Sequence, residues 1–358
     1  MWFAAPPILR DRQKDMGFLI YKRTGLKAYP LRRGAPLTTL LFLALAGLFL
    51  FFLVVRFDLN ARELWTNITE TNFAVLLAAF VLHYTTFIFR GARWRLLLIN
   101  VQRGEDPNPT IQNCGGLILV SWFVNCITVL RIGDIYRAHL YSTETGHSLS
   151  QTIGTVMAER IVDVFIMFGL LLLASGLMIS TGVDTPWIFV MFASSVPFLL
   201  GIVLMGMVIF KERFSRFLPF SLGEAYLRFH RGALGSYERL PVILVLGLLG
   251  WLAEAGRLFL VIQALGFDVS IPLVLFATLA NSLLTLLPIG GLGITEFGVA
   301  AILSSMLVET AASSVVIVDR LLSYLSVIVV GGILFLIRTE MNRRIQSSKE
   351  MVDLPSGK

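Results

Sequence analysis

Ionisable side chains interrupt stretches of this sequence that are otherwise apolar. These side chains are Glu159, Arg160, Asp163, Glu254, Arg257, Glu296, Asp319 and Arg320. An ionisable group at membrane depth costs at least ~2.5–3.5 kcal/mol on insertion scales, so such groups tend to face a cavity or each other. Arginine carries a planar guanidinium that binds phosphate through two hydrogen bonds. The set therefore predicts a buried site for an anion such as a phosphate group.

A second group of charges lies where an apolar run ends, in the stretch NCITVLRIGDIYRAHLY at 125–141. Arg131, Asp134 and Arg137 follow the apolar residues there. One interpretation places these three at the mouth of a hairpin that leads to the buried anion site. The other interpretation is that they end a helix at the cytoplasmic surface. The sequence leaves both interpretations open.

Glycines and carboxylates supply the remaining parts of the candidate site. Gly290, Gly291 and Gly293 interrupt an apolar run, and a helix broken in this way presents free backbone N–H groups that suit an anionic oxygen. Glu296 and Asp163 are suited either to holding an amine or to exchanging protons, and the residue types do not separate these two roles.

Ion pairing is the structural alternative for the same charges. Glu254 and Arg257 are three residues apart, so they can pair on one helix. Glu159 and Asp163 are four residues apart and share one helical face, from which Arg160 points about 100° away. On this interpretation internal ion pairs lock parts of the chain together, and an arginine near the start of a helix extends its head group to the membrane interface.

The elements that must position these charges are membrane helices. Of the 358 residues, 56% are hydrophobic and 15% are charged, whereas a soluble domain carries roughly 25% charged residues. The net charge is +7, but the basic residues cluster in loops between apolar runs, which indicates membrane orientation and anionic lipids rather than nucleic acid. Cys114 and Cys126 share one apolar stretch and the histidines are scattered, so we expect no metal and no cofactor.

The lengths of the apolar runs predict six full membrane spans and two further stretches in which a helix is broken. The predicted spans are 37–55, 73–89, 155–181, 187–210, 241–265 and 314–337. The broken stretches, 111–130 and 271–308, contain glycine or proline clusters within apolar runs. The distribution of Lys and Arg assigns four segments to the cytoplasmic side. These segments are the tail 1–36, the segment 90–110, the loop 211–240 and the tail 339–358.

With these orientations each broken stretch becomes a helical hairpin, re-entrant or crossing, and the two hairpins open from opposite faces. The predicted fold is an all-α polytopic membrane domain over 37–338, built as an inverted-topology repeat of about 37–182 and 187–338. Three matches between the repeats support this prediction. They are NCITVLRIGD (125–134) with NSLLTLLPIGG (281–291), ERIVD (159–163) with DRLLS (319–323), and Arg93 with Arg257. Because Arg93 matches Arg257, we count it among the candidate residues that bind the anion.

Five motifs in order resemble the integral membrane region of lysylphosphatidylglycerol synthases, a flippase-like family. They are RGARWRLLL (90–98), RIGDIYRAHL (131–140), TVMAERIVDVF (155–165), PIGGLGITEFG (288–298) and VDRLLSY (318–324). The resemblance covers 37–338 and implies movement of a lipid or lipid-linked head group between leaflets. Only 20 residues follow position 338, so the cytoplasmic aminoacyl-transfer domain of that family is not expected here. The family has proline before its first Gly-acid step, where this chain has Arg131-Ile132.

The sequence thus favours translocation of an anionic lipid head group across the plasma membrane, with both termini cytoplasmic. The expected partners are membrane lipids of the phospholipid, aminoacyl-phosphatidylglycerol or polyprenyl-phosphate type. An integral membrane transferase acting on a lipid phosphate and a structural envelope subunit are the alternatives. No Walker A pattern occurs, so transport would run on a gradient, through a partner, or downhill. A homo-oligomer and a separate synthase or glycosyltransferase partner both stay open.

Overall fold

The computed structural model describes residues 71–102, 109–128, 132–182, 185, 187–217, 219–284 and 294–353. For 189, 192, 193, 214, 294–297 and 342–353 it describes the backbone without the side chains. The predicted tail 1–36 and the predicted first span, 37–55, lie outside the described residues, as do Arg131, Gly290, Gly291 and Gly293. Glu296 lies in a described helix, but its side chain is outside the description.

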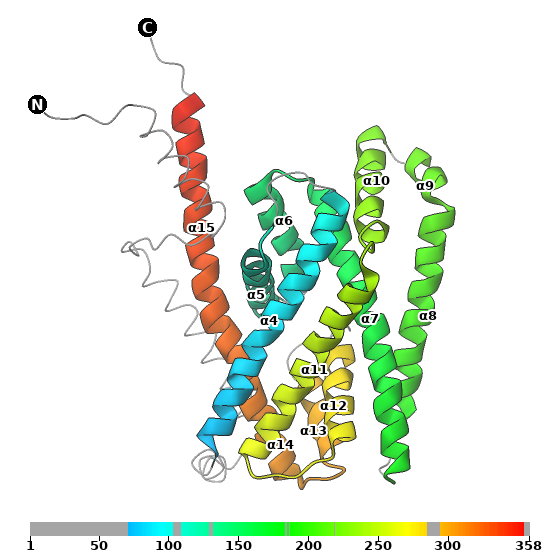
Figure 1. Ribbon diagram of the computed structural model, residues 1–358, viewed down its shortest axis with the longest axis vertical. Helices are drawn as coiled ribbons and strands as arrows, with labels where there is room; N and C mark the ends of the chain where they lie inside the picture. The colour runs from blue at the N-terminus through cyan, green and yellow to red at the C-terminus, as the bar shows by residue number, and fades with distance from the viewer. Residues whose placement is uncertain are drawn as a thin grey trace, which may run out of the picture.

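Every described element is helical, as predicted. With the labels of Figure 1, the elements are α4 (Phe73–Gln102), α5 (Ile111–Ile127), α6 (Gly133–Thr145), α7 (Leu149–Ser180), α8 (Trp187–Ile209), α9 (Lys211–Phe217), α10 (Phe220–Leu234), α11 (Leu240–Ala264), α12 (Ile271–Leu284), α13 (Ile294–Leu303), α14 (Glu309–Arg320), the π-helical turn η1 (Leu321–Leu325) and α15 (Ser326–Asp353).

Four helical segments are long and apolar enough to cross a membrane. They are α4, α7, α11 and the continuous run Glu309–Met341. These segments overlap the predicted spans that begin at 73, 155, 241 and 314. The helices α8 and α9 meet at a bend of 68° and would give a fifth crossing if they form one broken span. The structure therefore supports a multi-pass membrane protein, but it does not confirm the count of six spans.

The helix that contains the second predicted span does not end at residue 89, where that span was predicted to end. Helix α4 continues to Gln102, and Arg90 and Arg93 are 5% and 1% exposed inside the bundle. The sequence argument placed both arginines in a cytoplasmic segment because it treated basic residues as markers of the surface. Carboxylates from other helices neutralise both arginines, so the helix continues without a break.

Two pairs of short helices lie in opposite halves of the bundle. Helices α5 and α6 pack against each other in the half that contains α10, and α12 packs on α13 in the other half (Figure 1). At 17 and 14 residues, α5 and α12 are shorter than the ~20 residues that a bilayer requires. The Asn125 side-chain carbonyl accepts a hydrogen bond of 2.8 Å from the Gly133 backbone N–H and joins α5 to α6.

Glycines allow two of the helix contacts to be very close. A Cβ atom at Gly91 of α4 would lie 2.9 Å from the Cα of Gly115 on α5, and one at Gly154 of α7 would lie 2.8 Å from the Cα of Gly232 on α10. Small residues at such crossings are the usual way in which membrane helices pack closely. These contacts hold α5 and α10 against the helices that carry the buried charges.

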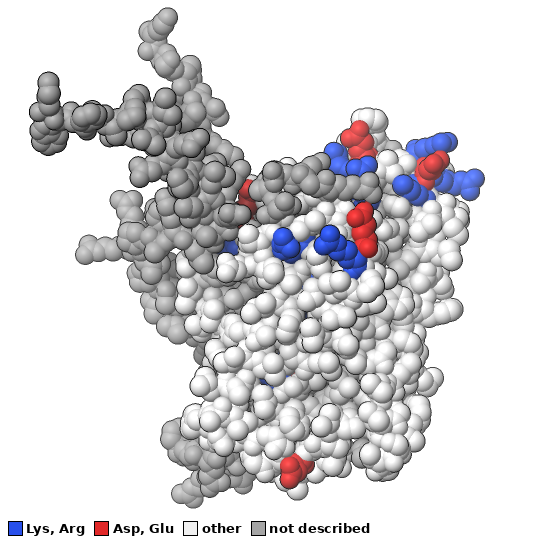
Figure 2. Space-filling view, in the orientation of Figure 1, with Lys and Arg blue, Asp and Glu red and all other residues white. Residues whose placement is uncertain are grey.

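The surface agrees with a membrane setting. Figure 2 shows the lysines and arginines gathered at the end of the molecule where α9 and α10 lie, above a wide belt without charge. Large apolar side chains are exposed along α8, including Ile188 at 75% and Phe198 at 70%. A contiguous exposed apolar surface of this kind marks contact with lipid or with a partner.

Candidate functional site

Three helices bring together six charged side chains in what we call the α7 cluster. Its members are Arg93 from α4, Asp134 and Arg137 from α6, and Glu159, Arg160 and Asp163 from α7. All six were predicted site residues. The spacing of four residues places the two α7 carboxylates on one helical face, and arginines of the neighbouring helices lie against this face.

Arg93 is the centre of the α7 cluster. Its Nη1 lies 2.7 Å from Asp163 Oδ1, and its Nη2 lies 3.0 Å from Glu159 Oε1 and 3.1 Å from Asp163 Oδ2. Trp251 of α11 donates an indole N–H to Asp163 Oδ1 at 3.0 Å. One guanidinium therefore joins two carboxylates, and α11 is tied to the same site.

Arg137 joins the hairpin α5–α6 to the same carboxylates. Its Nη2 lies 2.9 Å from Glu159 Oε2 and 3.2 Å from Asp134 Oδ1. The guanidinium carbon lies 4.8 Å from the centroid of the Trp94 ring. Arg137 is fully buried and Asp134 lies in the first turn of α6, so both residues belong to the start of a helix and not to the end of one.

Arg160 and Asp134 form the part of the α7 cluster that opens outward. Arg160 Nε lies 3.3 Å from Asp134 Oδ2, and Arg160 Nη1 lies 3.3 Å from Asp163 Oδ2. Their side chains are 34% and 26% exposed, whereas those of Arg93, Arg137, Glu159 and Asp163 are at most 2% exposed. A ligand that approaches the cluster would therefore meet Arg160 and Asp134 before the other members.

A second set of buried charges, the α11 cluster, consists of Arg90, Glu254, Arg257 and Asp319. Arg257 Nη2 lies 3.2 Å from Glu254 Oε2, as the spacing of three residues predicted, and Arg257 also pairs with Asp319 of α14. Arg90 Nη2 lies 3.7 Å from Glu254 Oε1. All four side chains are at most 9% exposed. The α11 cluster therefore links α4, α11 and α14 through charge.

Two tryptophans flank Arg90 of the α11 cluster, and one of them also contacts the α7 cluster. The guanidinium of Arg90 is 5.0 Å from the ring centroid of Trp251 and 5.2 Å from that of Trp122. Trp251 also donates to Asp163, so it contacts both clusters. A cation over an indole ring is stabilised by the ring quadrupole, more strongly when water is excluded.

Arg320 lies at the end of α14, next to Asp319. It donates a hydrogen bond of 2.7 Å to the side-chain carbonyl of Asn281 on α12, and its guanidinium lies 5.2 Å from the centroid of the Tyr324 ring. Tyr324 belongs to the π-helical turn η1, and such turns occur frequently at functional sites. Arg320 therefore holds α12 to α14, on the side of the bundle that also contains α13.

Arg90 is the site residue that sequence reasoning missed. The signal was available, because Arg90 and Arg93 have the same spacing of three residues as Glu254 and Arg257. The two tryptophans carry no comparable signal, since each is an ordinary apolar residue until packing brings it to a cation. Of the predicted residues, Arg131 and the three glycines lie outside the described residues, and Glu296 is described by its backbone alone.

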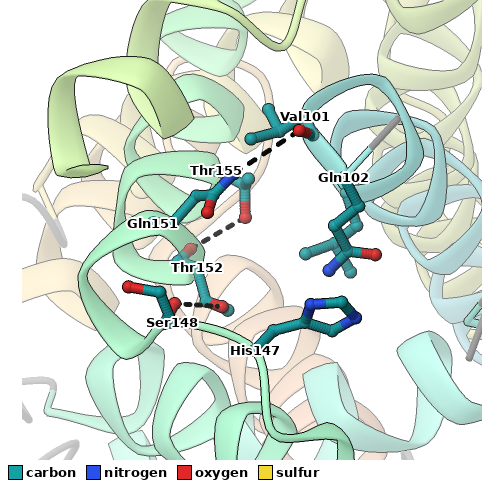
Figure 3. Close-up of a pocket in the computed structure, with 8 residues that line it drawn as sticks. Val101, Gln102, His147, Ser148, Gln151, Thr152 and Thr155 are labelled. Atoms are coloured by element: carbon teal, nitrogen blue, oxygen red, sulfur yellow. Dashed lines mark hydrogen bonds between the residues drawn. The ribbon is translucent and has the colours of Figure 1, made fainter. Parts of the chain in front are cut away.

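A small polar hollow lies beside the α7 cluster, between the end of α4 and the start of α7 (Figure 3). It encloses about 190 Å³ including its opening but fits only about one water molecule inside. The Thr155 hydroxyl on its wall accepts from Trp94 Nε1 at 3.1 Å and donates to the Thr152 carbonyl at 2.8 Å. The hollow therefore lies next to the residue that holds the Trp94 ring, on which Arg137 packs. It is too small for a lipid head group.

The known proteins to which this chain is similar are membrane proteins. Residues 39–331 match the family described as the lysylphosphatidylglycerol synthase TM region. A UPF0104 membrane protein of Methanocaldococcus jannaschii is 29% identical over 221 residues, which cover 60% of this chain and 94% of that protein. A UPF0104 membrane protein of Methanothermobacter thermautotrophicus is 27% identical over 286 residues, covering 72% and 82%. Another from M. jannaschii is 22% identical over 324 residues, covering 83% and 94%.

Proposed function

Because this chain belongs to the lysylphosphatidylglycerol synthase TM region family, we propose that it moves an anionic lipid head group between the two leaflets of a membrane. The observation that carries the proposal is the pair of buried charge clusters inside an apolar helical bundle. Charges at membrane depth are expensive and mark substrate or ion pathways. Replacing a buried ion pair by apolar residues of similar volume often leaves a protein as stable or more stable, so stability alone does not explain these clusters.

The two clusters together form a route for a head group. The route begins at the partly exposed pair Arg160 and Asp134, continues through the buried members of the α7 cluster, and crosses at Trp251 and Arg90 to the α11 cluster. Each arginine on the route has a carboxylate as its counter-ion, and Arg137 and Arg90 also lie over tryptophan rings. A phosphate can therefore replace a carboxylate as the counter-ion at successive arginines without leaving a guanidinium unpaired.

Arg160 is the proposed first contact for the phosphate. Its planar fork can bind two phosphate oxygens at once, and its partner Asp134 is exposed enough to turn away into water. The carboxylate of Asp134 can then receive any amine that the head group carries. This chemistry suits a phospholipid or a polyprenyl phosphate, since both offer a phosphate at the end of an apolar tail.

We also propose that the two halves of the chain form an inverted repeat. The matched positions of the repeats form matched ion pairs: Arg93 with Glu159 at 3.0 Å, and Arg257 with Asp319. The positions one turn earlier, Arg90 and Glu254, pair with each other. Hairpins α5–α6 and α12–α13 in opposite halves give further support (Figure 1). An inverted repeat places the substrate site between the halves, near the midplane.

The proposed setting is the plasma membrane, with the α9–α10 end and the C-terminus on the cytoplasmic side. The support is the gathering of lysines and arginines at that end (Figure 2), which the positive-inside rule assigns to the cytoplasm. On this orientation Asp134 and Arg160 receive the head group from the half of the bundle nearer the cytoplasmic leaflet.

Reconstitution in vesicles tests the proposed function. We expect the wild-type protein to move head-group-labelled phosphatidylglycerol between leaflets, measured as label that becomes accessible to a membrane-impermeant reductant. The variant Arg160→Ala should slow this movement about 10–100-fold, because a lost charge-assisted hydrogen bond is worth ~1.5–3 kcal/mol. The variant Arg320→Ala should slow it by a similar factor, because Arg320 holds α12 against α14 beside Asp319, the last residue of the route. Labelled polyprenyl phosphate in the same assay identifies the preferred class of lipid.

The matched control is Arg216→Ala on α9, which removes an arginine whose side chain is 82% exposed. This variant should move lipid at the wild-type rate, and all variants should insert and elute as the wild-type protein does. Wild-type rates for both lipids in Arg160→Ala and Arg320→Ala would refute the assignment of these arginines. A wild-type protein that moves neither lipid would refute the function itself.

A further inference from the structure

Helix α11 approaches the α7 cluster closely at a position that has no side chain. This position is Gly247, which is buried inside α11. A glycine inside a helix is less favourable than an alanine, because its backbone loses more conformational freedom on folding. A buried glycine in the interior of a helix therefore calls for a structural reason.

The guanidinium of Arg93 supplies this reason. A Cβ atom at Gly247 would lie 2.7 Å from Arg93 Nη1 and 2.5 Å from Cδ1 of Ile166 on α7. Ile166 Cδ1 is the end of a flexible apolar side chain, which can turn away. Arg93 Nη1 is fixed, because it donates to Asp163 Oδ1 at 2.7 Å while Nη2 of the same planar group donates to Glu159 and Asp163. A methyl group at Gly247 would therefore displace the guanidinium from its carboxylates.

The next glycine of α11 allows a comparison within one helix. Gly250 also faces an arginine of α4, but a Cβ atom there would lie 3.8 Å from Arg90 Cγ, which is an ordinary van der Waals contact. The two positions differ because Arg93 pairs with carboxylates of α7, whereas Arg90 pairs with Glu254 of α11 itself. Gly250 can therefore accept a methyl group, and Gly247 cannot accept one without movement of Arg93.

We propose that Gly247 is a positioning residue of the head-group route: the absence of a side chain there lets Arg93 hold both α7 carboxylates where the route turns toward α11. Trp251, one turn after Gly247, donates its indole N–H to the same Asp163 oxygen that accepts from Arg93 Nη1. One short segment of α11 thus sets the positions of both donors to this oxygen. The effect on lipid movement rests on the proposed function, whereas the positioning of Arg93 does not.

The shared oxygen gives a spectroscopic readout of the position of Arg93. In protein with tryptophan labelled at the indole nitrogen, the N–H resonance of Trp251 is the one that Trp251→Phe removes. The hydrogen bond from this N–H to Asp163 becomes stronger when the guanidinium no longer shares the oxygen, so the proton resonance moves downfield. We expect this shift in Gly247→Ala and not in Gly250→Ala. An unmoved resonance in Gly247→Ala would overturn the positioning role.

Second substitutions separate the arginine from apolar packing. Arg93→Lys has no Nη1 and removes the close approach of the arginine, whereas Ile166→Val has no Cδ1 and removes the apolar one. We expect Gly247→Ala to slow head-group movement in the vesicle assay about 10-fold, a coupling within the range of contacting residues. In an Arg93→Lys background the same substitution should scarcely change the rate, and Ile166→Val should not restore it. Gly250→Ala should move lipid at the wild-type rate.

Thermal unfolding of the same variants covers any that move lipid too slowly to measure. The loss of unfolding temperature on Gly247→Ala should be smaller in the Arg93→Lys background than in the wild-type background. If Gly247→Ala alone does not fold, its combination with Ile166→Val retains the close approach to Arg93 and takes its place in each measurement.

The possible outcomes distinguish the positioning role from the proposed function. Full recovery of lipid movement on Ile166→Val, with an undiminished loss in the Arg93→Lys background, would overturn the positioning role and leave Gly247 as a packing residue. A wild-type protein that moves no lipid, together with a shifted Trp251 resonance in Gly247→Ala, would refute the proposed function and leave the positioning of Arg93 established.

Discussion

At the scale of single residues, the charges of the α7 cluster do not form isolated ion pairs. One carboxylate contacts two arginines. Glu159 receives both Arg93 and Arg137, and Asp163 receives both Arg93 and Arg160. The α7 cluster contains three arginines and three carboxylates, so its formal charge is zero. In a set of shared pairs a charge that loses one partner keeps another, which is what a site that passes an anion along requires.

Because these ion pairs are shared, we can predict which single substitution destabilises the protein most. Glu159→Gln removes the carboxylate common to Arg93 and Arg137, both of which are almost fully buried. Breaking a buried pair in this way leaves an uncompensated charge and costs about 3–5 kcal/mol. We expect a large decrease in the thermal unfolding temperature of the purified protein, measured by light scattering or by intrinsic fluorescence.

The control for this prediction removes a glutamate carboxylate from an ion pair that is exposed to solvent. Glu212→Gln leaves Arg216 without its partner on α9, where both side chains are 82% exposed. Exposed ion pairs contribute at most about 1 kcal/mol, so the unfolding temperature should scarcely change. Equal losses in the two variants would show that burial of the α7 cluster does not set its energetics.

At the scale of helices, close contacts fix where the charged side chains point. Helix α7 carries three of the charges, and α10 packs on its first turns through Gly154 and Gly232. The backbones are so close that a Cβ atom at Gly154 would lie 2.3 Å from the carbonyl oxygen of Phe229. The contact cannot accept a methyl group without moving one helix.

Gly154→Ala should therefore destabilise the protein, by the ~1–3 kcal/mol typical of overpacking. The same substitution at Gly169, also on α7, meets no atom within 4 Å. There alanine should stabilise the helix by roughly 0.5–1 kcal/mol. The measurement is the shift of the unfolding temperature in each variant, and opposite signs are expected. A shift of the same sign in both would argue against the close contact between α7 and α10.

At the scale of the whole molecule, the proposed inverted repeat requires the two hairpins to open on opposite sides of the membrane. Thr143 lies near the open end of the α5–α6 hairpin, and Ser305 follows α13; both are exposed. Their positions at opposite ends of the bundle give a direct test of the topology.

Cysteines at these two positions should react with an impermeant maleimide from opposite faces. The background would be Cys114→Ala with Cys126→Ala, which removes the native thiols. We expect Thr143→Cys to be labelled from the cytoplasmic side in inverted vesicles, and Ser305→Cys in intact cells or right-side-out vesicles. Labelling of both from one face would exclude hairpins that open oppositely, and with them the inverted repeat.

The sequence determined the class of the protein and the positions of most of its charged groups. Apolar runs broken by charge require helices in a membrane, because lipid offers no partners to an open backbone. Spacing along a helix also predicted the pair Glu254–Arg257, since residues three and four apart must be neighbours. Lys and Arg counts, by contrast, did not indicate that α4 continues through Arg90 and Arg93 with both side chains buried, because a count does not show which basic residues have carboxylates beside them.

Only the tertiary structure decided which charges meet. Arg93 is 70 residues from Asp163 along the chain, and Arg90 pairs with Glu254 across two helices. Periodicity fixes the face of a helix on which a side chain lies, but not which other helix covers that face. The packing of glycine on glycine and of arginine on tryptophan makes that choice, because close packing selects one arrangement of helices among the many that their apolar faces alone would allow.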